Sequence, residues 1–230
     1  MNALQTLVPQ DKGFPPIIWE RQGNFKKVNE SCEQIAGCQK QLDAFLQLIQ
    51  EKDAALYQHS RRVQSFVHHF TQQLSLSTAE AEVIEVAALF HDLGKIIIDD
   101  AILQKPSSLT QKEFEQIQQH PTYGAMLLRQ IGAPKNVIHL VYHHHERWDG
   151  TGYPTGLSGE SIPLGARIIA IVDAFEVMIT SRPYSARRTE QQALAELHRC
   201  AGTQFDPILT DLFCHSVQPN LPHIQPTSVI

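Results

Sequence analysis

The sequence has no apolar run that approaches the 18 or so residues of a membrane span, and its first ten residues lack the basic flank and apolar stretch of an export signal. It has four cysteines without C-x-x-C spacing, which are few for a secreted disulfide framework. It has no excess of positive charge: the net charge of −5 argues against a broad nucleic-acid surface, while permitting a local cationic pocket for a phosphate ligand. We therefore expect a cytoplasmic protein with no membrane partner and no DNA partner.

Histidine, by contrast, is abundant, with 12 residues, three of them consecutive at His143, His144 and His145. A chain of 230 residues buries roughly 70–75% of its unfolded surface, so it does not need a metal merely to stay folded. Neutral imidazole is the commonest protein metal ligand. A metal site in this chain would therefore indicate chemistry.

Helix signals dominate the sequence and predict an all-α fold. An apolar pattern at helical spacing predicts one amphipathic helix from about Cys32 to Leu56, for packing or dimerisation, which leaves a homodimer open. We assign residues 1–48 to an N-terminal lead-in and helix of unknown role, 49–218 to the main domain and 219–230 to a flexible tail. Within the lead-in, residues 1–30 are expected to be loosely organised.

Several helix starts can be placed from capping signals. Three segments match the capping box, and one Asp-Pro pair matches an N-cap followed by proline: Ser77–Glu80, Thr110–Glu113, Thr189–Gln192 and Asp206-Pro207. The segment from Arg167 to Thr180 is apolar and has no turn signal. It is longer than a typical strand, so we predict a buried helix there.

A histidine and an aspartate follow a strongly apolar helical segment. Residues 83–90 place an apolar stripe on one helical face, and His91 and Asp92 come directly after it. Burying the Asp92 carboxylate is costly unless it is paired or bound to a cation, which His91 can share. We expect Gly94 to end this helix in the left-handed conformation, with Lys95 beside the pair and placed to meet a phosphate.

Asp173 is a second, independent indication of a bound metal ion. It lies within a stretch, residues 168–175, that is apolar on nearly every face, as buried helices are. An ionised aspartate there needs compensation, and a metal ion is one of the few partners that supplies enough. A neutral or N-capping aspartate is the alternative.

Further imidazole groups occur at His59, His120, His144 and His145, and any one alone would more often be a surface or hydrogen-bonded histidine. Together with the residues above they make seven nitrogen and oxygen donors, too many for one tetrahedral zinc. The set predicts a binuclear centre with a bridging aspartate. Ligands of this kind suit iron or manganese, although zinc, nickel and cobalt stay open.

These motifs, in this order, closely resemble the HD-GYP family, a branch of the HD phosphohydrolases. The matching segments are His91-Asp92-Leu93-Gly94-Lys95, Lys105-Pro106, His120-Pro121, His144 through Pro154, and Arg167 through Asp173. The resemblance covers about residues 49–218. It implies an HD-type helical bundle with a di- or trinuclear, commonly iron, centre that hydrolyses cyclic di-GMP to the linear dinucleotide pGpG or to GMP.

The resemblance also implies roles for individual residues. The metal ligands carry over onto His59, His91, Asp92, His120, His144, His145 and Asp173, with Asp92 as the bridge. Lys95 and Arg182 match positions that contact substrate phosphate, and Gly152, Tyr153 and Pro154 match the GYP loop. The expected mechanism is attack by a metal-bridging hydroxide on the phosphodiester, with two divalent ions, iron or manganese, as cofactors.

The sequence departs from the family pattern at three positions. Ala55 stands where trinuclear members carry a glutamate, so two metals are expected and a third is not; Ser185 replaces a basic residue; and Asp99 replaces a proline. Two other functions stay open. One is a weakly catalytic sensor that docks on a signalling protein, such as a diguanylate cyclase, through the loop around Tyr153. The other is an HD-type di-iron oxygenase.

Overall fold

The computed structural model describes residues 25–180 and 188–217, with side chains in the first range from Ser31 onward. These residues are helical and contain no strand, apart from one isolated bridge between Ala201 and Phe205, so the predicted all-α class is confirmed. The helices are α1 (Phe25–Gly37), α2 (Gln39–Lys52), α3 (Ala54–Thr71), α4 (Thr78–Phe90), the 3₁₀ helix η2 (Leu93–Ile97), α5 (Asp100–Leu103), α6 (Gln111–Ile117), α7 (His120–Gln130), α8 (Lys135–His143), the 3₁₀ helix η3 (Gly159–Ser161), α9 (Leu164–Ile179), α10 (Glu190–Arg199) and α11 (Pro207–Val217).

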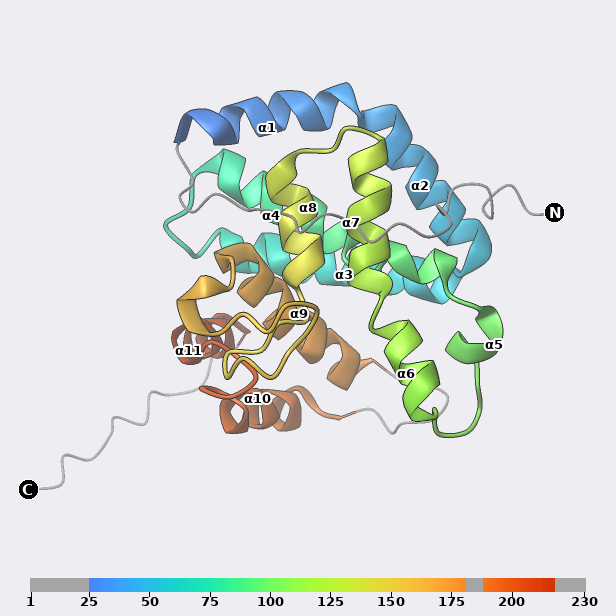
Figure 1. Cartoon of the computed structure of the whole chain (residues 1–230). Coiled ribbons are helices and arrows are strands. Elements are labelled where there is room, and N and C mark those ends of the chain that lie inside the picture. The colour runs from blue at the N-terminus through green and yellow to red at the C-terminus, as the bar shows by residue number, and fades with distance from the viewer. Residues whose placement is uncertain (1–24, 181–187, 218–230) are drawn as a thin grey trace, which may run out of the picture.

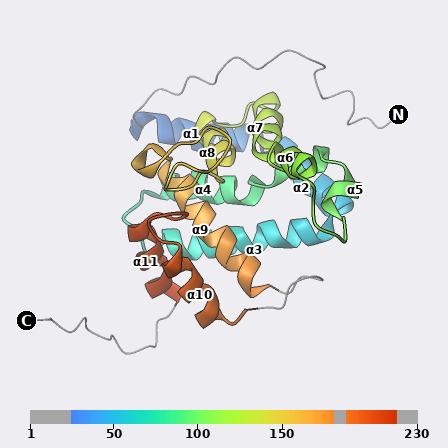
Figure 2. The same cartoon turned by 60° about the horizontal axis from the view of Figure 1, so that its bottom comes forward.

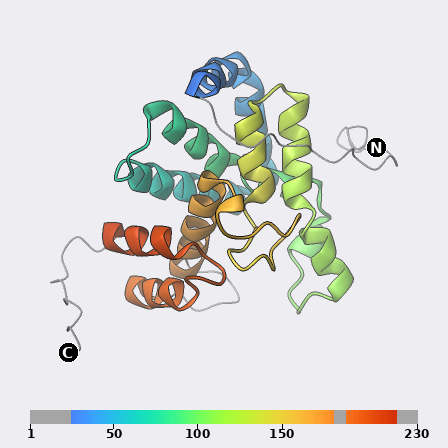
Figure 3. The same ribbon diagram turned by 60° about the vertical axis from the view of Figure 1, so that its left-hand side comes forward.

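The helices pack around α3, α4 and α9. Helices α3 and α4 pack side by side, and α9 crosses them (Figures 1 and 2). Helices α7 and α8 form a hairpin whose α8 packs on α4 (Figure 3), while α10 and α11 pack against α9. In the part of the chain that the structure describes, no helix combines the length and apolarity needed to cross a bilayer.

The N-terminal helices differ from the prediction. The single helix expected from about Cys32 to Leu56 is three helices, α1 to α3, which break at Cys38 and Asp53. Asp53 has extended backbone, and its carboxylate accepts a 2.9 Å hydrogen bond from the backbone N–H of Leu56, so it caps α3. The prediction of a loosely organised lead-in is wrong for residues 25–30, which are helical. Residues 1–24, which that prediction also covers, lie outside the residues that the structure describes. Helix α2 is continuous across residue 48, and the domain limits stay a prediction.

The capping predictions are confirmed. All three boxes show both reciprocal hydrogen bonds: Ser77 with Glu80, Thr110 with Glu113, and Thr189 with Gln192. Asp206 accepts hydrogen bonds from the backbone N–H groups of Ile208 and Leu209 at the start of α11. Asp99, which stands where the family pattern has a proline, also caps a helix, because its carboxylate accepts from Ala101 N at the start of α5.

The segment predicted as a buried helix is α9, and it forms the centre of the core. Ile168, Ile169, Ile171 and Phe175 are almost completely buried on it. Each such side chain contributes about 1.5–3 kcal/mol by leaving water. Gly165 lets α9 approach α4 and α8, because a Cβ there would lie 2.6 Å from a methyl group of Leu140. This core fixes α9, and with it Asp173, relative to the other helices.

Gly94 has a different role from the one predicted. Helix α4 already ends at Phe90, and Gly94 lies within η2 without a left-handed backbone. Its lack of a side chain permits contact between η2 and α7 instead: a Cβ would lie 2.0 Å from the carbonyl oxygen of His120 and 2.6 Å from the backbone nitrogen of Gly124. Gly94 therefore brings the start of α7, with His120, against Asp92.

We expect Gly94→Ala to lower the free energy of unfolding by about 1–3 kcal/mol, because backbone atoms must move to admit the methyl group. Gly37→Ala is the matched control, since a Cβ at Gly37 meets nothing within 4 Å. Urea unfolding of both variants measures the effect. Equal stability of the two variants would contradict the close approach.

Candidate metal centre

Three histidines of the centre are fixed by their own backbone turns. In each, Nδ1 donates a 2.7 Å hydrogen bond to the carbonyl oxygen three residues earlier: His91 to Ala88, His120 to Ile117 and His144 to Val141. These carbonyls belong to the last turns of α4, α6 and α8, where helix carbonyls lack their usual partners. Because a carbonyl can only accept, Nδ1 carries the proton and Nε2 presents its lone pair inward when the ring is neutral.

The fourth oriented histidine, His59, is held by a side chain. Its Nδ1 lies 2.6 Å from Oε2 of Glu176, which is buried on α9. Its Nε2 lies 3.2 Å from Oδ1 of Asp173 and 3.4 Å from Nε2 of His91. The ring is therefore directed inward by a carboxylate, whereas the other three are directed by carbonyl groups.

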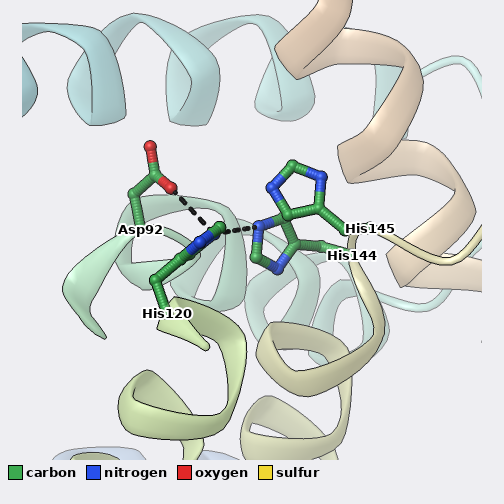
Figure 4. Close-up of side chains that lie close together, drawn as sticks. All are labelled: Asp92, His120, His144 and His145. Carbon is green, nitrogen blue, oxygen red and sulfur yellow. Dashed lines mark hydrogen bonds and ion pairs between the residues drawn. The ribbon is translucent and has the colours of Figure 1, made fainter. Parts of the chain in front are cut away.

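All seven predicted ligands come together in two groups. One, the Asp92 group, contains Asp92, His120, His144 and His145 (Figure 4); the other, the Asp173 group, contains His59, His91 and Asp173. Within each group, one ligand atom from every residue lies within 4.8 Å of the others. No other such group occurs in the described residues, and His143 belongs to neither.

Asp92 lies between the two groups. Its Oδ1 is 3.2 Å from Nε2 of His120, in its own group. Its Oδ2 is 3.4 Å from Nε2 of His91 and 3.6 Å from Nε2 of His59, in the Asp173 group. Each carboxylate oxygen therefore faces a different set of imidazoles, which is the geometry of a bridging ligand.

These side chains fit metal ions. Nε2 of His120 and Nε2 of His144 lie 3.2 Å apart, and both rings donate through Nδ1, so two lone pairs face each other when the rings are neutral. Asp92 Oδ1 is buried and accepts no hydrogen bond from the described residues. Buried acceptors are costly without a donor or cation. Nitrogen and carboxylate donors without thiolate suit first-row divalent ions.

Burial and neighbouring carboxylates set the protonation states of three imidazoles in the centre. It lowers the pKa of His120 to about 3 and that of His145 to about 4, so both rings are neutral near pH 7. Burial alone would also lower the pKa of His59, but the carboxylates of Asp173 and Glu176 raise it to about 9. His59 therefore binds a proton in the metal-free protein and releases it when it ligates a metal.

Lys95 lies at the edge of the centre, as predicted. Its Nζ donates a 2.7 Å hydrogen bond to Oδ2 of Asp92, and its side chain is partly exposed. Burial by itself raises the pKa of Asp92, but the charges of Lys95 and His91 hold that pKa well below its usual range. The ammonium group is thus available both to the carboxylate and to an anion from solvent.

The predicted GYP loop packs directly on the centre. The Tyr153 ring lies 4.9 Å from the His145 ring, centroid to centroid, and Tyr153 N donates to the carbonyl of His145. A Cβ on Gly152 would lie 2.4 Å from the backbone nitrogen of Arg147, so only glycine allows this approach. Gly152 therefore faces protein backbone, and the substrate contacts of Gly152, Tyr153 and Pro154 stay predictions.

Three positions singled out in the sequence are not among the residues that form the described centre: Arg182, Ser185 and Ala55. Arg182 and Ser185 lie outside the described residues. Ala55, which stands at the position of the third-metal glutamate, is exposed in the first turn of α3, and the metal count stays a prediction.

Two buried glutamates, Glu146 and Glu176, were not predicted from the sequence. Glu176 accepts hydrogen bonds from His59, Arg62 and Thr180. Glu146 accepts from the backbone N–H and the hydroxyl of Thr155, and so fastens the loop after Pro154. Glu176 could have been found by the argument used for Asp173, because it lies in the same apolar helix.

Comparison with known proteins identifies the family to which the chain belongs. A family model described as HD domain matches residues 43–209. The chain belongs to the HD domain family. Its membership of the HD-GYP branch, expected from the motifs, is confirmed by relatives named as cyclic di-GMP phosphodiesterases.

Two curated relatives of this HD domain illustrate the match. The cyclic di-GMP phosphodiesterase response regulator RpfG of Xanthomonas campestris pv. campestris (strain 8004) is 39% identical over 177 residues, which are 74% of this chain and 46% of RpfG. The 3'3'-cGAMP-specific phosphodiesterase 3 of Vibrio cholerae serotype O1 is 35% identical over 164 residues, which are 71% of this chain and 36% of the relative. The chain therefore spans less than half the length of either relative.

A solved structure supports the fold. An HDG"Y"P protein from Bdellovibrio bacteriovorus matches with a TM-score of 0.60 and 18% identity, over 84% of this chain and 67% of that chain. The HD-type helical bundle predicted from the sequence is confirmed.

If the two groups hold metal ions, Mn²⁺ will stabilise the folded state. At a free concentration near 100 times Kd, one bound ion contributes about 2.7 kcal/mol, a rise in melting temperature of roughly 5–10 °C for a chain of this size. We expect His144→Ala to reduce this rise and the exposed His198→Ala to preserve it. Thermal unfolding with and without Mn²⁺ measures the increment for each variant. An undiminished increment in His144→Ala would contradict the assignment.

Proposed function

We propose that this chain is a metal-dependent phosphodiesterase that hydrolyses cyclic di-GMP, to pGpG or to GMP. The observation that carries the proposal is Asp92, with one oxygen facing each of two adjacent ligand groups. Such a pair of sites suits in-line displacement at phosphorus. The names of the relatives support a cyclic dinucleotide as substrate, with 3'3'-cGAMP as the second compound to test.

The proposed cofactors are two divalent ions, iron or manganese, one in the Asp92 group and one in the Asp173 group. Bound there, such ions would supply Lewis-acid polarisation of the phosphoryl group and activation of water. The seven donors would be His59, His91, Asp92, His120, His144, His145 and Asp173. Five of these donors are buried, whereas His145 and Asp173 are partly exposed, so the centre is shielded from bulk water except beside these two residues.

Other residues of the chain would bind the substrate phosphate and limit the space in the site. Lys95 is the cation at the edge of the centre, so its ammonium group would leave Asp92 to bind a non-bridging phosphate oxygen. Tyr153 and Gly152 hold the loop against His145 and thereby limit the space beside that imidazole. Arg182 is proposed as a second phosphate contact from its match to the family pattern.

Partners other than the substrate are also proposals. A diguanylate cyclase or another signalling protein would dock on the loop around Tyr153, and the chain would form a homodimer. Both proposals rest on sequence patterns alone.

We expect Asp92→Asn to lower the turnover of cyclic di-GMP by roughly 10³-fold, because the neutral amide weakens both ligand groups by several kcal/mol in total. Asp211→Asn, a change at an exposed position on α11, is the matched control and will keep wild-type turnover. The assay is product chromatography with metal-loaded protein under anaerobic conditions.

Full turnover by Asp92→Asn would contradict the proposed site. Nucleotide binding without product, in protein shown to contain metal, would favour the sensor function instead. A product formed only when oxygen is admitted would favour the oxygenase.

A further inference from the structure

The strongest feature outside the seven proposed ligands is the buried carboxylate of Glu176 on α9. Its side chain is 1% exposed, yet it contacts three polar groups. It belongs to neither ligand group. A carboxylate this deeply buried is costly unless its partners compensate for lost hydration, so its contacts indicate its role.

The two oxygens of Glu176 have different partners. Oε2 lies 2.6 Å from Nδ1 of His59, on the side of the ring that faces away from the ligand groups. Oε1 accepts hydrogen bonds from Nε of Arg62 and from the hydroxyl of Thr180, the latter at 2.7 Å. Arg62 and Thr180 thus fix the carboxylate through Oε1, and Oε2 orients the imidazole of His59.

The register of two helices creates this arrangement. His59 and Arg62 are three residues apart on α3, and Asp173 and Glu176 are three residues apart on α9, which crosses α3. His59 therefore lies between two carboxylates, with Nε2 toward Asp173 at 3.2 Å and Nδ1 toward Glu176 at 2.6 Å. Arg62, half exposed, supplies the countercharge for the buried Glu176.

We propose that Glu176 is a positioning residue that strengthens metal binding selectively in the Asp173 group by orienting His59 and increasing its basicity. His91, His120 and His144 donate to neutral carbonyls, so the charged partner of His59 distinguishes one group from the other. A carboxylate hydrogen-bonded to a ligating imidazole fixes the tautomer and raises ligand basicity, and its loss commonly weakens metal binding 10–100-fold, an order-of-magnitude figure of about 1.4–2.7 kcal/mol. This inference rests on the two metal sites of the proposed function.

The test is titration of the metal-free protein with Mn²⁺ alone, followed by calorimetry, and it needs no nucleotide. We expect two binding events in the wild type. In Glu176→Gln, we expect one event to weaken by about 10–100-fold and the other to stay within about threefold of the wild type. Thr180→Val is the matched control, because it removes one hydrogen bond from the same carboxylate without touching His59, and both of its affinities will stay within about threefold of the wild type.

A second variant, Glu176→Asp, keeps the test decisive if Glu176→Gln does not fold. Glu176→Asp keeps the charge but withdraws the carboxylate from His59 by about one C–C bond, so it will weaken the same event by less than Glu176→Gln does. Circular dichroism of the metal-free proteins establishes that each variant is folded. If Glu176→Gln does not fold, Glu176→Asp is judged by the same selective loss.

Two results would overturn the inference: both events unchanged in a folded variant, or both events weakened equally, which would indicate a general structural role. The outcome is independent of the enzyme assay. A protein that binds two ions with the predicted asymmetry but hydrolyses no cyclic dinucleotide would support the role of Glu176 while contradicting the proposed activity.

Discussion

The centre depends on hydrogen bonds that orient imidazole rings from behind. Four histidines use Nδ1 to contact an acceptor on the outer side of the ring, and this directs Nε2 inward. The consequence for His120 and His144 is a pair of Nε2 acceptor atoms 3.2 Å apart, beside an aspartate oxygen that accepts no hydrogen bond within the described structure. Such an arrangement is unfavourable for neutral rings in an apolar interior, and cations resolve the conflict.

The fold provides these orientations at the ends of its helices. His91 follows α4, His120 follows the end of α6 and begins α7, and His144 follows α8, where backbone carbonyls lack partners from their own helix. Close backbone contacts then bring these ends together, most clearly where Gly94 meets the carbonyl of His120. Helix α9 completes the centre from the other side, because its apolar surface anchors it in the core while Asp173 and Glu176 face α3.

Much of this could be predicted from the sequence. The capping boxes are recognisable because their hydrogen bonds are local, and the two carboxylates are recognisable because Asp92 directly follows an apolar helical segment and Asp173 lies within one. Assembly of all seven side chains was expected from the resemblance to HD-GYP proteins. Their division into two groups, with one oxygen of Asp92 toward each, required the packed structure.

Two of the failures, at Gly94 and Glu176, involve contacts between residues far apart in the chain. The local pattern around Gly94 predicts a helix end, whereas the close contacts of Gly94 are with α7. Glu176 is 117 residues from His59, so no local pattern links them. The breaks at Cys38 and Asp53 were hidden because the apolar periodicity continues across them, although the capping role of Asp53 was a local signal that could have been used.

The most direct test of the account is a crystal structure of the protein loaded with Mn²⁺, with anomalous difference maps measured to locate the ions. The account predicts two peaks, one coordinated by the Asp92 group and one by the Asp173 group, with the Asp92 carboxylate between them. A single peak, or two peaks with Asp173 directed away from both, would contradict it.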